Sequence, residues 1–141
     1  ENDLANAKPW MDTWPMAELT IPRLGIRQIV LAGDSGQSLA FGPGHRTGSA
    51  LPGNPGVTLI SGHRDTHFQF LSQLENGDQI ELKNQGNFNL KYQVEHAQVV
   101  DKKYQLSATG DENLLILATC WPMGVTVEDA DERYLVFARR M

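Results

Sequence analysis

Leu114-Leu115-Ile116-Leu117-Ala118-Thr119 is an unbroken apolar run that leads directly into Cys120. A run of this length between polar connections is typical of a buried strand. Cys120 is the only cysteine of the 141-residue chain, and Trp121-Pro122 follow it. The run therefore predicts a rigid strand that carries a thiol at its end.

A second apolar run, Val57–Ser61, ends at Gly62-His63-Arg64. Shorter β-prone segments lie around these two runs, separated by turns rich in glycine and proline. The predicted strands are Glu18–Ile21, Ile26–Leu31, Val57–Ser61, Gln79–Leu82, Phe88–Val100, Leu114–Thr119 and Tyr134–Ala138. A short helix is expected where Phe68, Leu71 and Leu74 recur at helical spacing. Short strands with few helical stretches predict an all-β fold, either a barrel or a sandwich.

The length fits one domain, preceded by an N-terminal segment of different character. Residues 1–16 are polar, with Trp10 and Trp14 interleaved. We expect this segment to form an arm or a short helix that packs on the rest of the molecule through its tryptophans. Residues 17–141 then form the main domain.

The composition excludes several classes of protein. The net charge is −5 and the basic residues form no stripe, so no nucleic-acid partner is expected. One cysteine cannot form an intramolecular disulfide or a four-cysteine zinc site. No run of about 18 apolar residues is present that could span a membrane.

Three side chains at predicted strand ends could carry chemistry. A thiolate at Cys120 would be a nucleophile if a base or cation lay beside it. His63 could exchange protons near neutral pH. Arg133 could donate two hydrogen bonds to a carbonyl oxygen or an oxyanion.

Each of these residues also has a structural interpretation. Cys120 could be a buried, inert thiol, because free cysteines are among the most buried residues. His63 could be a loop histidine bonded to Asp65 or to the backbone. Arg133 could form a surface ion pair with Glu132, which would contribute little.

His63 and His67 are four residues apart, a spacing that could bind a metal on a helix. Arg64 stands where a zinc protease would carry its glutamate, and no further ligand is evident. We therefore expect no catalytic metal.

Together, the motifs resemble those of one family. The segment Leu59–Asp65, followed by Phe68, looks like the histidine motif of sortases. Leu117-Ala118-Thr119-Cys120 is similar to their Thr-Leu-x-Thr-Cys motif, with Ile116 in place of the first threonine. Arg133-Tyr134-Leu135-Val136 resembles the arginine at the start of their last strand. Ile21-Pro22-Arg23-Leu24 and Gly77-Asp78 agree as well. The order of histidine, cysteine and arginine also matches that of the family.

The resemblance implies a closed eight-stranded sortase-like β-barrel with short helices in its connections. It implies that His63, Cys120 and Arg133 are catalytic, and that Thr119 and Trp121 contact the substrate. It implies no cofactor. The arm and the acid-rich loop before Arg133 look most like the subclass found in Gram-negative bacteria.

The family activity implied is that of a cysteine transpeptidase. Such an enzyme cleaves a Leu-Pro-x-Thr-Gly-like signal between threonine and glycine through a thioacyl enzyme, and transfers the acyl group to an amine. The expected partners are an exported protein that bears the signal and an amine acceptor on the cell envelope. The expected location is the periplasmic face of the inner membrane, with an N-terminal anchor outside this sequence.

Two other functions remain open from the residues themselves. One is a cysteine protease or hydrolase that transfers the acyl group to water. Cell-wall L,D-transpeptidases also use cysteine and histidine, but their Ser-x-Gly-Cys type motif is absent. The other is a non-catalytic β-barrel binding module in which Cys120 is inert.

Overall fold

The computed structural model describes residues 15–33, 42–63, 67–84, 89–101, 103, 113–121 and 132–141, with only the backbone of Cys120 and Trp121. The strands are β1 (Pro15–Ile21), β2 (Ile26–Ala32), β3 (Gly44–His45), β4 (Gly56–Ser61), β5 (Gln79–Asn84), β6 (Asn89–Asp101), β7 (Asn113–Trp121) and β8 (Glu132–Arg140). The short helices η2 (Pro22–Leu24) and η3 (Gln69–Gln73) are both of the 3-10 type.

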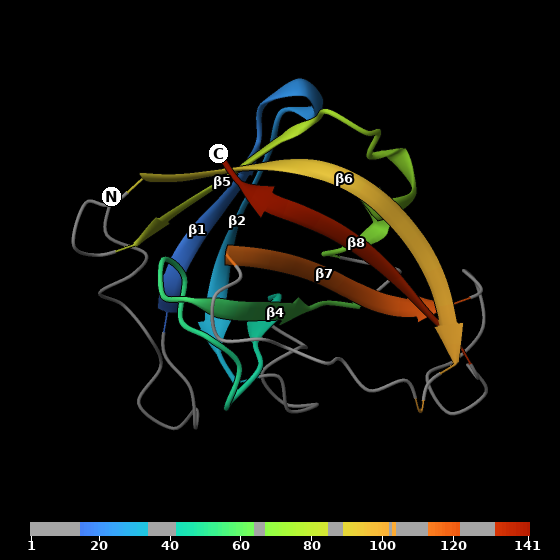
Figure 1. Cartoon of the computed structure of the whole chain (residues 1–141), viewed down its shortest axis with the longest axis horizontal. Coiled ribbons are helices and arrows are strands. Elements are labelled where there is room, and N and C mark those ends of the chain that lie inside the picture. The colour runs from blue at the N-terminus through green and yellow to red at the C-terminus, as the bar shows by residue number, and fades with distance from the viewer. Residues whose placement is uncertain are drawn as a thin grey trace.

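The strands close into a barrel in the order β1-β2-β3-β4-β7-β8-β6-β5 (Figure 1). Most neighbouring strands are antiparallel, whereas β2 and β3, and β4 and β7, pair in parallel. Strand β1 pairs with both β2 and β5, which completes the closure. The predicted all-β, eight-stranded barrel is therefore confirmed, and the helices of its connections are only 3-10 turns within the described residues.

Each strand predicted from the sequence is present, and most are longer than expected. Strand β3 was not predicted, because two residues in a glycine-rich stretch carry no periodic pattern; its pairing with β2 and β4 makes it a strand. Strand β1 already begins at Pro15, so positions 15 and 16 belong to the barrel. The rest of the predicted arm lies outside the described residues.

Strands β4 and β7 are buried on both faces, which explains their unbroken apolar sequences. Their inward side chains, such as Ile60, Leu115 and Leu117, join the interior core of the barrel. Their outward side chains belong to a second group, the outer apolar cluster, which consists of Val57, Leu59, Val100, Ile116, Ala118, Leu135 and Phe137. Burying a large aliphatic side chain contributes about 1.5–3 kcal/mol. The two strands are thus held firmly from both sides.

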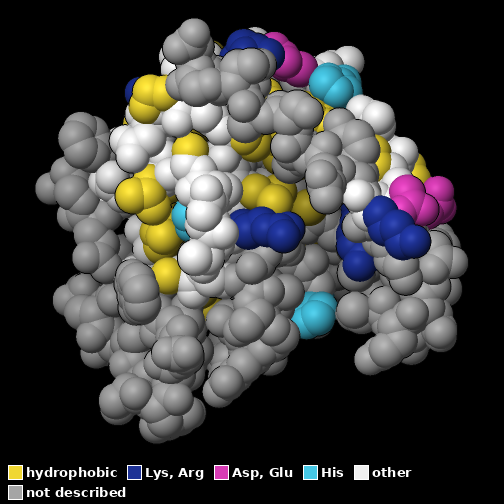
Figure 2. Space-filling model, turned by 60° about the horizontal axis from the view of Figure 1, so that its bottom comes forward, with side chains coloured by type: hydrophobic (Ala, Val, Ile, Leu, Met, Phe, Trp, Pro, Cys, Tyr) yellow, Lys and Arg dark blue, Asp and Glu magenta, His cyan; other side chains and the backbone are white. Residues whose placement is uncertain are grey.

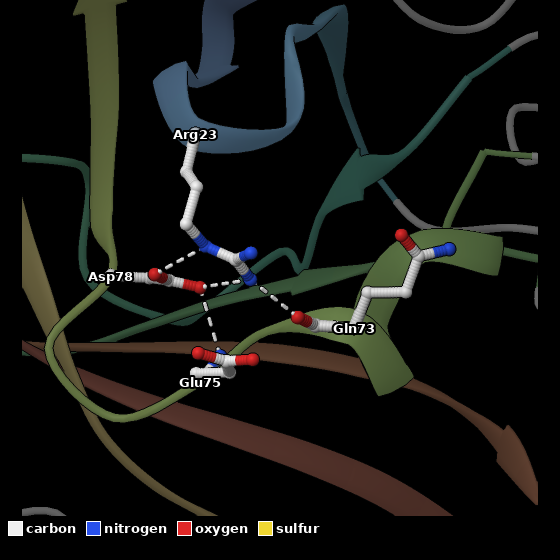
Figure 3. A network of polar contacts seen from close by, with 4 residues as sticks. All are labelled: Arg23, Gln73, Glu75 and Asp78. Atoms are coloured by element: carbon white, nitrogen blue, oxygen red, sulfur yellow. Dashed lines mark hydrogen bonds and ion pairs between the residues drawn. The ribbon is translucent and has the colours of Figure 1, made fainter.

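An ion pair fastens η2 to the connection between η3 and β5 (Figure 3). Arg23 Nε donates to Asp78 Oδ1 at 2.7 Å, and Arg23 Nη2 donates to Oδ2 at 2.9 Å. Nη2 also donates to the carbonyl oxygen of Gln73 at 2.7 Å, and Asp78 Oδ2 accepts from the backbone N–H of Glu75 at 2.8 Å. One guanidinium therefore holds the end of η3 and the entry to β5 together.

This pairing makes the stability of the barrel depend on pH. The hydrogen bonds from Arg23 lower the pKa of Asp78 below its ordinary value of 3.8, and burial of the carboxylate opposes them only in part. A lowered pKa in the folded state stabilises the protein above the unfolded value, and this contribution is lost as the pH falls through the folded value.

We expect Asp78→Asn to lower the denaturant midpoint of unfolding at neutral pH, because the amide cannot pair with the guanidinium. The difference from the unmodified chain should shrink as the pH falls from 3.8 toward the lower pKa of folded Asp78, because the unfolded chain binds its proton first, and vanish once folded Asp78 is protonated too. Urea unfolding of both proteins over a series of pH values measures this.

Glu18→Gln is the matched control, because Glu18 pairs with Arg27 on the surface at 2.6 Å. Exposed ion pairs contribute little, so its midpoint should barely change. If Asp78→Asn lowered the denaturant midpoint by the same amount at every pH, the ionic origin of the effect would be contradicted.

Candidate active site

Cys120 lies near the end of β7, where the strand pairs on one side with the beginning of β8. The backbone register places Cys120 opposite Arg133, and Ala118 opposite Leu135. Side chains alternate along a strand, so position 120 shares a face with Ala118, a member of the outer apolar cluster. The positions of the cysteine and the arginine predicted from the sequence are thus paired across β7 and β8.

The parallel partner of β7 brings His63 to the same place from the other side. Ser61 of β4 pairs with Ala118, and the N–H of Gly62 donates to the carbonyl oxygen of Ala118 at 3.1 Å. His63 follows Ser61 by two residues and Cys120 follows Ala118 by two residues, so both positions come just after the last pair of the β4–β7 ladder. We call His63, Cys120 and Arg133, which come from the segment after β4, from β7 and from β8, the candidate catalytic row.

Arg133 is half-buried at the start of β8. Its Nη1 donates to the carbonyl oxygen of Glu132 at 2.9 Å, a contact to the backbone. The strand fixes the base of this side chain, since Arg133 pairs with Cys120 on one side and with Val100 of β6 on the other. The guanidinium is thus carried on a rigid strand beside the cysteine position.

The segment that follows β4 is fixed by contacts on both sides of His63. The N–H of Phe68 donates to the carbonyl oxygen of His63 at 2.9 Å, and Gln28 Nε2 donates to the carbonyl oxygen of His67 at 2.6 Å. The fully buried ring of Phe68 lies against Gly62, where an added Cβ would come within 2.7 Å of Cγ. Gly62 therefore permits a close approach that no larger residue allows.

Two observations bear on His67 and on metals. Burial lowers the pKa of His67 below its ordinary value of 6.5, and electrostatic repulsion by His63 lowers it further. Among the residues that the structure describes, no three His, Cys, Asp or Glu side chains are grouped to hold a metal ion.

The other two predicted site residues also lie at the end of β7. Thr119 is 4% exposed, and its Oγ1 donates to the carbonyl oxygen of Gly62 at 2.8 Å. Trp121 pairs with Glu132 through the backbone, and its side chain lies outside the described part of the chain. A substrate contact of either residue stays a prediction.

The strand ends that carry Cys120 and Arg133 lie at one side of the barrel. In Figure 1, the end of β7, the start of β8 and the end of β6 meet at the lower right. Figure 2 brings the lower side of this view forward and shows apolar side chains at its centre, with Lys or Arg side chains beside them.

Residues 19–141 match the protein family described as Sortase domain. The chain belongs to the sortase family. Sortase D of Bacillus subtilis (strain 168) is 32% identical over 126 residues, which cover 87% of this chain and 62% of that protein's length. Sortase A from Corynebacterium diphtheriae superposes with a TM-score of 0.82 at 28% identity, over 94% of this chain and 63% of that chain. A sortase D5 transpeptidase of Clostridium perfringens gives a TM-score of 0.78 at 25% identity, over 90% and 79% of the two chains.

The sequence of this sortase predicted the residues of the candidate catalytic row, but not the groups that hold their segments. Gly62 and Phe68 were recognised as parts of a motif, and only their contact in the structure gives them a role. Gln28 carried no sequence signal at all, because it lies 39 residues away from the carbonyl group that it binds. In this domain of the sortase, no described helix is long and apolar enough to cross a membrane.

The contact of Gly62 with Phe68 yields a test of how the His63 segment is held. We expect Gly62→Ala to destabilise the barrel by about 1–3 kcal/mol, because the new methyl group overlaps a ring that has no room to move. Thermal unfolding measures the loss.

Phe68→Leu in the Gly62→Ala background provides the matched comparison. The smaller side chain should recover part of the stability that Gly62→Ala loses, although Phe68→Leu alone is destabilising. Strictly additive losses in the double variant would show that the ring is not the obstacle.

Proposed function

We propose that this domain is a sortase transpeptidase in which Cys120 is the nucleophile, His63 the proton carrier and Arg133 the stabiliser of the oxyanion. The observation that supports this most is the strand register: Cys120 pairs with Arg133, and Ser61, two residues before His63, pairs with Ala118, two residues before Cys120. A nucleophile, a proton carrier and an oxyanion donor at the same end of neighbouring segments suit acyl transfer. Three separate structural roles would give these residues no reason to lie near one another.

In the first half of the reaction, the Cys120 thiolate attacks a peptide carbonyl carbon of the substrate. The carbon–sulfur bond forms, a negative charge gathers on the carbonyl oxygen, and collapse of this intermediate breaks the carbon–nitrogen bond. The departing amine takes a proton from His63. A thioacyl enzyme remains.

In the second half, an amine takes the place of the departed peptide. His63 accepts the proton of the amine as nitrogen attacks the thioester, so a carbon–nitrogen bond forms and the carbon–sulfur bond breaks. Cys120 is released as a thiolate and His63 is again protonated, which restores the starting state. No cofactor takes part in these steps.

Arg133 acts on the charge that develops in both halves. A guanidinium beside the cysteine can donate two parallel hydrogen bonds to an oxyanion or to a substrate carbonyl group. Donors held in place before the reaction favour the transition state over the substrate. The pairing of Arg133 with strands on both sides supplies this rigidity.

The substrate in this proposal is an exported protein with a Leu-Pro-x-Thr-Gly-like signal, cleaved between threonine and glycine. The acceptor is an amine of the cell envelope, to which the protein becomes anchored. Trp121 is the proposed substrate contact beside the cysteine. Family membership supports the general class of substrate and the envelope location.

Two finer assignments rest on the sequence alone. Residues 1–16 and the acid-rich loop before Arg133 support a place in the Gram-negative subclass, and hence the periplasmic face of the inner membrane. The relatives reported above are sortases of classes D and A from Gram-positive bacteria.

Transfer to an amine separates a transpeptidase from a cysteine protease. We expect a labelled Leu-Pro-x-Thr-Gly peptide to yield a thioacyl adduct at Cys120, and added amine to divert this adduct from the free acid to the amide. An amine competes with bulk water only if the site positions it. Mass spectrometry of the products at rising amine concentration measures the partition.

Cys120→Ala is the control, because it removes the only thiol and should form neither adduct nor product. If the free acid is the sole product with every amine tested, the domain is a hydrolase. If no adduct forms with any peptide of the panel, the enzyme assignment itself fails.

Arg133→Lys tests the oxyanion role, because lysine keeps the charge but loses the planar pair of donors. We expect turnover to fall by about 10²–10³, the usual cost of one oxyanion donor, with little change in melting temperature. Arg139→Lys is the matched control on the same strand, since Arg139 pairs with Glu95 on the surface at 2.9 Å. Equal activity of the two variants would exclude the proposed role.

A further inference from the structure

The hydroxyl group of Thr119 lies inside the barrel. Alternation along β7 places Thr119 with Leu115 and Leu117, which belong to the interior core, whereas Arg133 shares the outer face of β8 with Leu135 and Phe137. Thr119 is 4% exposed and donates its hydroxyl proton inside the barrel. This orientation suits an internal contact better than a contact with a bound peptide.

The acceptor of this bond is the carbonyl oxygen of Gly62, in the peptide unit that leads into His63. Oγ1 of Thr119 lies 2.8 Å from it, a buried contact between residues 57 positions apart. Strand β4 ends at Ser61, so Gly62 and His63 lie beyond the last paired residue of the strand. The hydroxyl group of Thr119 therefore links β7 to this segment beyond the last backbone pair of β4 and β7.

The backbone is fixed on both sides of the histidine. The Gly62 carbonyl oxygen accepts from Thr119, and the next one, that of His63, accepts from the N–H of Phe68 at 2.9 Å. The first of these bonds comes from the strand that carries Cys120, as does the bond that the Gly62 N–H donates to the carbonyl oxygen of Ala118 at 3.1 Å. The Thr119 hydroxyl group is thus a side-chain contact that relates the segment of His63 to the strand of the proposed nucleophile.

We propose that Thr119 is a positioning residue, whose hydroxyl group sets the distance and orientation of His63 relative to Cys120 by holding the Gly62 carbonyl group. This inference rests on the proposed roles of His63 and Cys120. Loss of the hydroxyl leaves a buried carbonyl group without this donor and lets the His63 segment shift. Displacements of about 1 Å between reacting groups can lower a rate by about 10².

The test compares Thr119→Val, which removes the hydroxyl and keeps the shape, with Thr119→Ser, which keeps the hydroxyl. Thr58→Val is the matched control, because Thr58 is another buried threonine, on β4, at 2% exposure. Two properties are measured in each protein: kcat and KM for cleavage of a Leu-Pro-x-Thr-Gly peptide, and the NMR titration of the His63 ring, identified with His63→Ala.

We expect Thr119→Val to lower kcat by about 10–100-fold with KM nearly unchanged, because the alignment of reacting groups is lost and not the binding of peptide. The titration midpoint of His63 should move in the same variant. Thr119→Ser should restore both properties most of the way, and Thr58→Val should leave both unchanged.

A raised KM with unchanged kcat in Thr119→Val would overturn the inference and assign Thr119 to substrate binding. An unmoved His63 titration would overturn it as well, whatever the kinetics. Failure of the proposed function is a separate result. In that case the unmodified chain would cleave no peptide, whereas the NMR titration of His63 would still report on the Thr119 contact.

Discussion

The parallel pairing of β4 with β7 is the constraint on which the rest of the site depends. It joins two apolar strands that lie 57 residues apart in the chain at the Thr119–Gly62 contact. A slip of one residue would turn every side chain of a strand to the opposite face. The interior core and the outer apolar cluster both oppose such a slip, because it would turn the apolar side chains that belong to each group to the opposite face of the sheet.

The two-sided burial of β7 also explains why a nucleophile can be carried at its end. A site on a rigid strand keeps its geometry better than one on a loop. Strand β8 adds Arg133 with the same rigidity, since it pairs with β7 and β6 together. His63 is the exception, because it lies beyond the end of its strand and depends on individual hydrogen bonds and on the packing of Phe68 against Gly62.

The ion pair of Arg23 and Asp78 acts on the same segment from its far end. It holds the last residue of η3, and η3 begins directly after Phe68. The connection from β4 to β5 is therefore fixed near the candidate catalytic row by Thr119, Phe68 and Gln28, and near β5 by a buried carboxylate. The motifs Ile21–Leu24 and Gly77-Asp78 carry no reactive group, but their ion pair helps to hold the connection that contains His63.

The sequence by itself determined the class of fold and indicated the candidate reactive residues. Apolar runs and glycine-rich turns are local features, so they predicted the strands, and the residues around His63, Cys120 and Arg133 resembled sortase motifs. Strand β3 was not predicted, because its two residues carry no periodic pattern. Only the tertiary structure decided the strand order, the register, the close approach of Phe68 to Gly62 and the inward bond of Thr119. These arise between residues far apart in the chain, and no local propensity specifies which distant strand a given strand meets or in which register.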